Sequence, residues 1–367
     1  MARIIVALSG GVDSAVAALI LKEQGWEPIG VHLRLWDSDP DDPACALEGV
    51  CGGDQAADDA RAVACALGIP FYVYDLRDDF TREVAEMTIA AYARATTPNP
   101  CIACNHKVRI PGLLRLAESL GIDAVATGHY VRKEMISGRW FLAEGDDRRR
   151  DQSYALYRLG SSDLARLEFP LGDLDKAAVR ERARRAGIGV ANKASSVDLC
   201  FAKSSGGIGK LVAERRPETG QPGPLVDEAG QVIGRHPGIA YVTIGQRSGL
   251  TWNRTTPERR YVSRIDSPGG RVVVAPRERL LTASTGLLDP IRHDDRARLP
   301  ALEARIRYQG ERYPVGWDDE TGRVRFTEPG PPLAAGQAVV LYAGHRVIGG
   351  GTAVDIERAR PDEITAD

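Results

Sequence analysis

Ser9-Gly10-Gly11-Val12-Asp13-Ser14 is the stretch that decides the fold of this chain. It lies between the apolar run Ile4–Leu8 and the helix-forming run Ala15–Gln24. A strand, a glycine turn and a helix start form an anion site, because glycines let the backbone approach a phosphate and the first helical turn points its N–H groups at it. The two serines add hydroxyl donors, and Asp13 either caps the helix or holds Mg²⁺. We therefore expect a phosphate site at the start of a βα unit.

The usual nucleotide fingerprints do not describe this stretch. A Walker A loop needs a Lys that is absent here, and no G-x-G-x-x-G follows the strand. As they stand, residues 9–14 resemble the PP-loop of the ATP pyrophosphatases. That resemblance implies cleavage of ATP between the α and β phosphates and adenylation of a substrate. An ordinary glycine-rich turn between a strand and a helix is the structural alternative.

The residues up to about 130 alternate between strand and helix patterns. Further strands are expected at Pro28–Trp36, Phe71–Tyr74 and Ala124–Thr127, and helices at Asp54–Leu67, around Thr81–Ala95 and up to Leu120. Alternating β and α elements predict a doubly wound parallel sheet covered on both faces, an α/β fold. Ligands bind such sheets at the carboxyl ends of the strands. The loop after Leu8, the strand end near Leu33 and Gly128-His129 should therefore surround one crevice.

Composition sets broad limits on function. The chain has 367 residues, 43% of them apolar and 27% charged, which is ordinary for a protein of two or three domains in water. No apolar stretch is long enough for a signal peptide or a membrane span, so we expect a cytoplasmic protein without a membrane partner. The net charge of −2 gives no global basic field. Contacts with nucleic acid would have to use local clusters such as Arg148–Arg150.

The six cysteines do not suggest a disulfide framework in a chain of this length. Cys65 lies in an apolar helical pattern and is expected to be buried, and Cys45 and Cys51 receive no role. Cys104 follows the proline-rich loop Thr97–Pro100 near a helix start, where the helix dipole lowers the pKa of a thiol. One alternative is that Cys101 and Cys104 are simply two packed thiols. The other is that they form half of a zinc site, for which only Cys200 remains as a further ligand.

Beyond Gly206 the pattern changes to short strands. Leu225–Ile233 and Tyr261–Val274 read as hairpins, and from about Ala283 short strands alternate to the end, which predicts a small β-barrel. We place the domains at 1–205, 206–281 and 282–360. An acidic tail, 361–367, is expected to be disordered.

Several motifs in one order resemble the tRNA-specific 2-thiouridylase family nearly from end to end. The matching stretches are Ala7–Ser14, Thr97–Pro100 with Cys104-Asn105, Ala126–Tyr130, Asp151–Tyr154, Cys200-Phe201, Gly245–Arg247, Arg307-Tyr308, and Gly336-Gln337 followed by Gly349–Gly351. The chain departs from the family pattern at Ser195, Arg109-Ile110, Ser248 and Cys101, which puts the fine positioning in doubt rather than the activity.

The resemblance implies a role for each matching position. ATP would be bound by Ala7, Leu8, Ser9, Gly10, Gly11, Val12, Asp13, Ser14, Leu33 and Gly128, with Mg²⁺ as cofactor. The catalytic thiols would be Cys104, as nucleophile, and Cys200, as the carrier of a persulfide. Contacts with tRNA, some of them beside the target base, would be made by Asn99, Pro100, Cys101, His129, Arg150, Asp151, Gln152, Arg307, Tyr308 and Gln337.

The activity implied is ATP-dependent 2-thiolation of the wobble uridine in a tRNA anticodon loop. Adenylation of the C2 oxygen would precede sulfur transfer, and a sulfur donor protein (a cysteine desulfurase or a relay) would supply the persulfide. An iron–sulfur cluster on Cys101, Cys104 and Cys200 is the alternative sulfur carrier, with one iron left open. Two rival functions also stand: an adenylating synthetase that delivers ammonia, and a non-catalytic RNA-binding protein that keeps the fold.

Overall fold

A computed structural model describes residues 2–36, 54–193, 199–202, 206–253, 259–293, 301–318 and 320–360. The expectations for Cys45, Cys51, Ser195 and the acidic tail lie outside these residues. The chain divides into two compact units. The first comprises Met1–Ala85, Pro100–Ser204 and His345–Val347, and the second comprises Glu86–Asn99, Ser205–Gly344 and Ile348–Asp367.

A parallel sheet forms the centre of the first unit, as predicted. Its five strands stand in the order β3-β2-β1-β4-β7, and every neighbouring pair is parallel. The strands are β1 (Arg3–Ala7), β2 (Glu27–Arg34), β3 (Phe71–Asp75), β4 (Ala124–Ala126) and β7 (Leu167–Glu168). Because β1 lies between β2 and β4, the loop after β1 lies beside the ends of both neighbouring strands.

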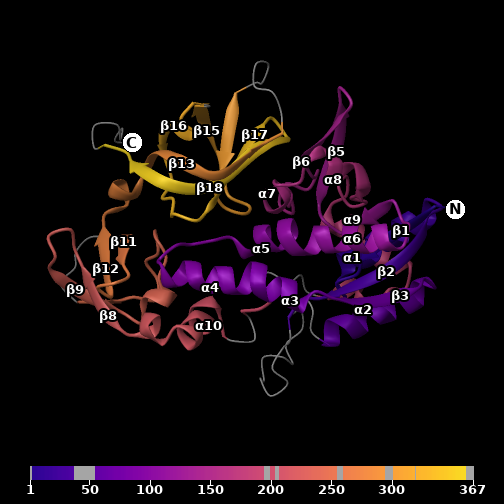
Figure 1. Cartoon of the computed structure of the whole chain (residues 1–367), viewed down its shortest axis with the longest axis horizontal. Helices are drawn as coiled ribbons and strands as arrows, with labels where there is room; N and C mark the ends of the chain where they lie inside the picture. The colour runs from indigo at the N-terminus through magenta and orange to yellow at the C-terminus, as the bar shows by residue number, and fades with distance from the viewer. Residues whose placement is uncertain are drawn as a thin grey trace. The chain divides into compact units, whose positions relative to one another are not determined.

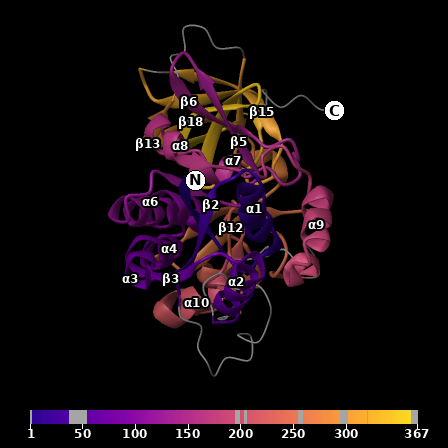
Figure 2. The ribbon, with the colours of Figure 1, turned by 90° about the vertical axis from the view of Figure 1, so that its right-hand side faces the viewer.

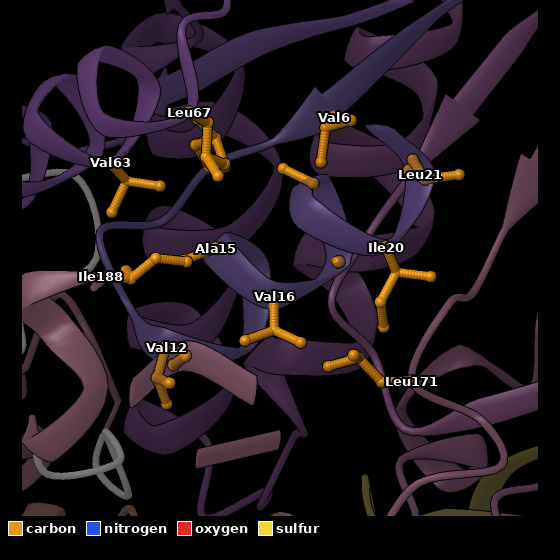
Figure 3. Close-up of a cluster of buried hydrophobic side chains, with 14 of the residues drawn as sticks. Val6, Val12, Ala15, Val16, Ile20, Leu21, Val63, Leu67, Leu171 and Ile188 are labelled. Carbon is orange, nitrogen blue, oxygen red and sulfur yellow. The ribbon is translucent and has the colours of Figure 1, made fainter. Parts of the chain in front are cut away.

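Helices cover both faces of this sheet (Figure 2). One face carries α1 (Val12–Glu23), α2 (Asp54–Leu67) and α9 (Lys176–Arg185), and the other carries α3 (Arg77–Phe80) and α6 (Ile110–Ser119). The side chains of α1 pack against those of β1, α2 and α9 in one apolar cluster, which includes Val6, Val16, Leu67 and Leu171 (Figure 3). Each fully buried Val or Leu contributes roughly 1.5–3 kcal/mol by leaving water. Helix α1, which follows the glycine loop, is therefore anchored along its length.

The remaining elements of the first unit lie around the sheet. The bounds are η2 (Thr81–Ala85), α5 (Pro100–Ala103), η3 (Cys104–Arg109), β5 (Val131–Ile136), β6 (Arg139–Glu144), α7 (Ser153–Leu156), α8 (Ser161–Arg166) and η4 (Gly189–Asn192). The helix expected to begin around Thr81 begins at Arg77 instead and passes through the π-helical turn η2. A second π-helical turn, η3, begins at Cys104.

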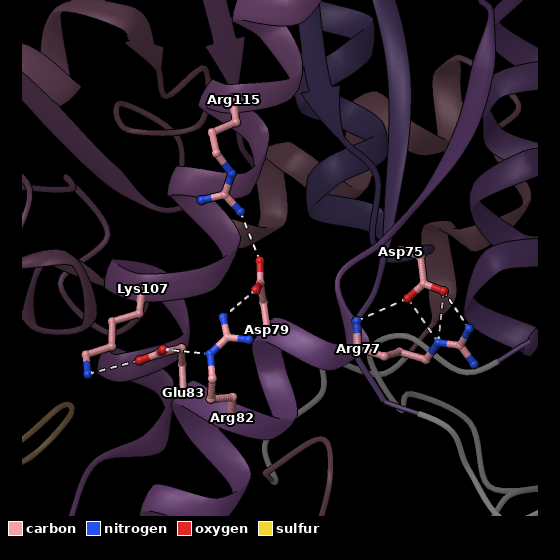
Figure 4. Close-up of polar contacts among 7 residues, drawn as sticks. All are labelled: Asp75, Arg77, Asp79, Arg82, Glu83, Lys107 and Arg115. Carbon is pink, nitrogen blue, oxygen red and sulfur yellow. Dashed lines mark hydrogen bonds and ion pairs between the residues drawn. The ribbon is translucent and has the colours of Figure 1, made fainter.

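Ion pairs connect the two π-helical turns and the helices beside them (Figure 4). Asp79 accepts hydrogen bonds from Arg82 at 2.6 Å and from Arg115 at 3.0 Å, and Glu83 accepts from Lys107 at 3.3 Å. These side chains are partly or largely exposed, so solvent screens each pair and its contribution to stability is small. Their effect is to tie the helix that carries Cys104 to the helix that begins at Arg77.

The second unit contains a small five-stranded sheet in the order β10-β9-β8-β12-β11. Both predicted hairpins are present, as β8 (Gly223–Val226) with β9 (Val232–His236) and as β11 (Tyr261–Asp266) with β12 (Arg271–Ala275). The other elements here are α4 (Glu86–Ala93), α10 (Ile208–Arg215), η5 (Pro217–Gly220), η6 (Ile239–Tyr241), β10 (Thr251–Trp252) and η7 (Arg277–Leu280). Figure 1 shows α4 and α10 next to each other, and they are in contact.

Six further strands close into the predicted β-barrel, because the first pairs with the last. They are β13 (Thr282–Arg292), β14 (Leu302–Arg305), β15 (Arg312–Asp318), β16 (Arg323–Gly330), β17 (Ala338–Ala343) and β18 (Arg346–Arg358). The expectation of short strands throughout is wrong for β13 and β18, which have 11 and 13 residues. Register shifts along the β13–β18 pairing let these long strands bend around the barrel.

One cysteine prediction is also wrong. Cys65 lies on the exposed side of α2, whereas its neighbour Ala64 is buried. The apolar residues around Cys65 suggested burial, but the helical period places Cys65 next to the buried face of α2 and not on it.

A turn of the barrel holds the start of the Thr97–Pro100 loop within the second unit. Thr97 N donates to Ala335 O at 2.9 Å, and Gly336 has φ of +91°. A Cβ on Gly336 would lie 2.4 Å from Thr96 Cγ2 and 3.1 Å from the carbonyl carbon of Thr97. Glycine at position 336 therefore allows both the positive φ and the close approach of Thr96 and Thr97.

Gly336→Ala should destabilise the protein by about 2–4 kcal/mol, because strain at positive φ adds to overpacking. Gly344→Ala is the matched control, since Gly344 also has positive φ, +61°, but no neighbour within 4 Å of the added Cβ. It should cost only about 1–2 kcal/mol. Urea unfolding measures both, and equal losses would show that the Thr96 contact yields without cost.

Candidate active site

The glycine loop between β1 and α1 fits closely among its neighbours. Gly10 has φ of +74°, and a Cβ there would lie 2.5 Å from Ala56 O and 3.0 Å from Asp59 Cβ on α2. Gly128, after β4, is equally confined, because its Cβ would lie 2.8 Å from Ser14 N. The backbone thus approaches α2 closely at Gly10 and the start of α1 closely at Gly128, as a site that brings N–H groups close to phosphate requires.

Ser14 stabilises the loop itself. Its Oγ accepts a hydrogen bond from Ser9 N and donates one to Gly11 O, both at 3.1 Å, and lies 3.2 Å from Ser9 Oγ. The residue is only 5% exposed. The hydroxyl expected to face phosphate is thus engaged by the loop backbone in this structure.

Asp13 is the second residue of α1, and it does not cap the helix. Gly11 occupies the N-cap position and no side chain caps it, so the capping alternative is wrong. Instead, Asp13 Oδ1 accepts hydrogen bonds from Tyr130 Oη at 2.6 Å and from Lys176 Nζ at 2.5 Å. Burial and the Asp13 carboxylate raise the pKa of Tyr130, which keeps the phenol a donor. A carboxylate held at the loop is an appropriate ligand for Mg²⁺.

Two histidines lie at the same edge of the sheet, and both are neutral. His32 Nδ1 lies 2.9 Å from Leu8 O, and because a carbonyl only accepts, this nitrogen carries the proton. Burial lowers the pKa of His32. Desolvation, together with the charge of Arg109, lowers the pKa of His129 to about 3. His129 Nδ1 also lies 2.7 Å from Thr127 Oγ1.

The three thiols of interest differ in their access to solvent. Cys104 is 6% exposed, one turn into the helix that starts at Pro100, whereas Cys101 is exposed and Cys200 is partly exposed. Asn105, beside Cys104, donates to Ala155 O at 3.4 Å. Among the described residues, which include all three cysteines, no group of three or more His, Cys, Asp or Glu could hold a metal ion. In this structure the three thiols therefore do not form an iron–sulfur ligand set.

The residues predicted to contact tRNA fall into two groups. Arg307 and Tyr308 are exposed in the second unit, and Arg150 is partly exposed in the first, next to exposed Arg148 and Arg149. Asp151, by contrast, is 1% exposed, and its Oδ2 accepts from Ser153 Oγ at 2.8 Å. The two glutamines also bind backbone N–H groups through their side-chain oxygens. Gln152 Oε1 accepts from Tyr130 N at 3.0 Å, and Gln337 Oε1 accepts from Ala334 N at 2.6 Å. The side chains of Asp151, Gln152 and Gln337 therefore stabilise the loops around them.

Comparison with known proteins identifies the family. Family models described as the tRNA methyl transferase HUP domain, the tRNA methyl transferase PRC-barrel domain and the aminomethyltransferase beta-barrel domain match residues 2–204, 210–276 and 292–353. The tRNA-specific 2-thiouridylase MnmA of Moorella thermoacetica is 43% identical over 95% of this chain and 98% of its own. Its counterpart from Symbiobacterium thermophilum is 41% identical over 97% and 92%. The chain belongs to the tRNA-specific 2-thiouridylase family.

Membership of the 2-thiouridylase family confirms the predicted fold, with its HUP domain, central barrel-like domain and closed C-terminal barrel. It also confirms the prediction of a tRNA-modifying transferase. No helix among the described residues is long and apolar enough to span a membrane.

Sequence reasoning did not single out three residues that the structure places at the loop. They are Lys176 and His32, to which the sequence assigns no role, and Tyr130, which is only the last residue of a matching motif. Lys176 is distant from Asp13 in sequence, and only the packing of α9 on α1 brings them together.

The low pKa of His129 predicts a specific acid response. As the pH falls through 6.5 the unfolded chain binds a proton at this imidazole, but the folded chain does not until about pH 3. This group therefore removes stability progressively between those values and has no effect above them. In an NMR titration His129 should stay neutral at pH 5, and His129→Gln should reduce the loss of stability between pH 6.5 and 4. A midpoint near 6.5 would contradict this.

Proposed function

We propose that this protein thiolates C2 of the wobble uridine of tRNA, using ATP to activate the C2 oxygen and a cysteine persulfide to deliver sulfur. The observation that carries the proposal is the close approach of backbone at Gly10 and Gly128, the latter to the start of α1, with the Asp13 carboxylate beside it. It supports a nucleotide site at residues 7–14 with Leu33 and Gly128. The family relationship supplies tRNA as the substrate.

Activation is needed because the C2 oxygen of uridine is a poor leaving group. This oxygen attacks the α-phosphorus of ATP, pyrophosphate leaves, and the uridine is left with AMP on C2. Backbone N–H groups of the loop stabilise the charge on the departing pyrophosphate. Mg²⁺, which Asp13 would hold, supplies further charge neutralisation there.

Sulfur transfer follows from the two cysteines and their different exposure. The terminal sulfur of a Cys200 persulfide attacks C2, and AMP leaves. The Cys104 thiolate then attacks Cys200 Sγ, the S–S bond breaks, and its electron pair stays on the sulfur now bound to C2. The product is 2-thiouridine together with a Cys104–Cys200 disulfide, so a persulfide donor protein and a dithiol reductant are both required.

The exposure of the thiols supports this assignment. A donor protein must reach the carrier, and Cys200 is the more accessible of the two, whereas the resolving thiol Cys104 needs to meet only the bound intermediate. An iron–sulfur route finds no ligand group among the described residues. A synthetase that delivers ammonia would need neither Cys104 nor Cys200. The persulfide route uses both cysteines.

One set of variants tests the proposal through two measurements, ATP-dependent release of pyrophosphate with unmodified tRNA, and thiolation. Asp13→Ala should lose both by about 10²-fold or more while tRNA binding survives. Cys104→Ser and Cys200→Ser should still release pyrophosphate but form no 2-thiouridine, and Cys101→Ala should retain measurable thiolation. Wild-type protein that releases no pyrophosphate with tRNA would refute the adenylation step. Stoichiometric iron and sulfide lost with all activity in Cys101→Ala would refute the persulfide step.

Binding of tRNA should depend on local arginine clusters, because the chain carries no global positive charge. Arg149→Ala and Arg307→Ala should each weaken tRNA binding and reduce the slope of log K against log salt by about 0.7–0.9. ATP affinity should not change. Arg3→Ala is the control, since Arg3 is exposed at the start of β1, the opposite end of that strand from the glycine loop. Unchanged slopes would mean that these arginines are ordinary solvated surface.

A further inference from the structure

The glycine loop lacks the lysine that a Walker A loop uses to bind phosphate. Backbone N–H groups alone offset the charge of a triphosphate only in part, and a departing pyrophosphate needs further positive charge. In the described part of the first unit, two lysines approach the loop from a single stretch of chain, α9 and the following turn η4.

Lys176 approaches the side of the loop where α1 begins. It is the first residue of α9, its side chain is 11% exposed, and its Nζ lies 2.5 Å from Asp13 Oδ1. Its Nζ also lies 5.9 Å from the centre of the Tyr130 ring. Burial lowers the pKa of Lys176, and the Asp13 carboxylate opposes that effect. A cation so poorly solvated binds an incoming anion more strongly than an exposed lysine does.

Lys193 approaches the side where Gly10 lies. It follows η4 directly, its side chain is 14% exposed, and it forms an ion pair with Asp59 of α2. Asp59 borders the glycine loop, because a Cβ added at Gly10 would lie 3.0 Å from Asp59 Cβ. Each lysine is therefore held by a carboxylate that is part of the glycine loop or in contact with it.

We propose that Lys176 and Lys193 are phosphate-binding residues that neutralise the pyrophosphate leaving group during adenylation. In the absence of nucleotide, Asp13 and Asp59 hold the two ammonium groups near the loop. When Mg²⁺ and ATP bind, the phosphate oxygens replace these carboxylates as partners of the lysines, and Asp13 becomes available to the metal ion. This inference rests on the proposed use of ATP at this loop.

A purely structural role for these ion pairs gives a different expectation. If Lys193 served only to hold Asp59, then Asp59→Asn would have the same effect as Lys193→Met. If Lys193 binds phosphate, Asp59→Asn leaves the positive charge of Lys193 in place and should lower pyrophosphate release much less than Lys193→Met does. Lys133 provides a matched control, because it is 13% exposed and pairs with Glu168 at 2.9 Å, a residue of the edge strand β7.

The test uses the full chain with unmodified tRNA. Lys176→Met and Lys193→Met should each lower kcat for ATP-dependent pyrophosphate release by about 10²-fold and weaken inhibition by inorganic pyrophosphate at least tenfold. Lys133→Met should leave both quantities near wild type, and the Asp59→Asn defect should be much smaller than that of Lys193→Met. Equal kinetics in Lys176→Met, Lys193→Met and Lys133→Met, or an Asp59→Asn defect equal to that of Lys193→Met, would overturn the proposal.

A second measurement uses wild-type protein and does not depend on the folding of any variant. The rate at which an amine-reactive reagent modifies each lysine is measured by mass spectrometry with and without Mg²⁺ and inorganic pyrophosphate. Pyrophosphate should slow modification of Lys176 and Lys193 at least fivefold and leave Lys133 unchanged. Absence of protection would overturn the inference even if the enzyme thiolates tRNA. Protection in a protein that releases no pyrophosphate with tRNA would refute the proposed reaction and keep the phosphate-binding role.

Discussion

The close approach of backbone to backbone at Gly10 and Gly128 is the constraint on which the first unit depends. A Cβ at either position would collide with a carbonyl oxygen or an amide nitrogen of a neighbouring segment, and neither of those groups can move without disturbing a helix. Because no side chain intervenes at Gly128, the chain after β4 lies directly against the start of α1. This arrangement follows from how the sheet and its first helix pack, and burial of the apolar side chains of α1 stabilises it.

The polar groups at this edge are arranged by that packing and not by local sequence. The Asp13 carboxylate accepts hydrogen bonds from the phenol of Tyr130, which follows β4, and from the ammonium group of Lys176 on α9. It is therefore held from two directions. His32 and His129 remain neutral beside it, because their surroundings disfavour a positive charge on the imidazole. Positive charge at this edge is therefore concentrated on lysine and arginine side chains and on helical N–H groups, because burial lowers the pKa of both histidines.

Sequence reasoning was most successful where a signal is local. Alternating strand and helix patterns predicted the parallel sheet, and the pattern of Tyr261–Val274 predicted the β11–β12 hairpin. It failed where the outcome depends on which residues meet after folding. The position of Cys65 on the exposed side of α2, the long bent strands β13 and β18, and the pairing of Lys176 with Asp13 all depend on packing between segments far apart in sequence. No short-range pattern encodes these contacts.

In the proposed mechanism, the burial of Cys104 would set the order of events in sulfur transfer. A thiol that is 6% exposed reacts poorly with a donor protein or with small oxidants, so Cys104 would stay a thiol until a persulfide is delivered next to it. Cys104 lies at the start of the π-helical turn η3, and ion pairs from Lys107 and Arg115 tie this helix to the one before it. With Cys104 on this braced helix and Cys200 more exposed, the proposed loading and release of sulfur would be separate steps. The chain would then accept sulfur from outside and discharge it only onto an activated base.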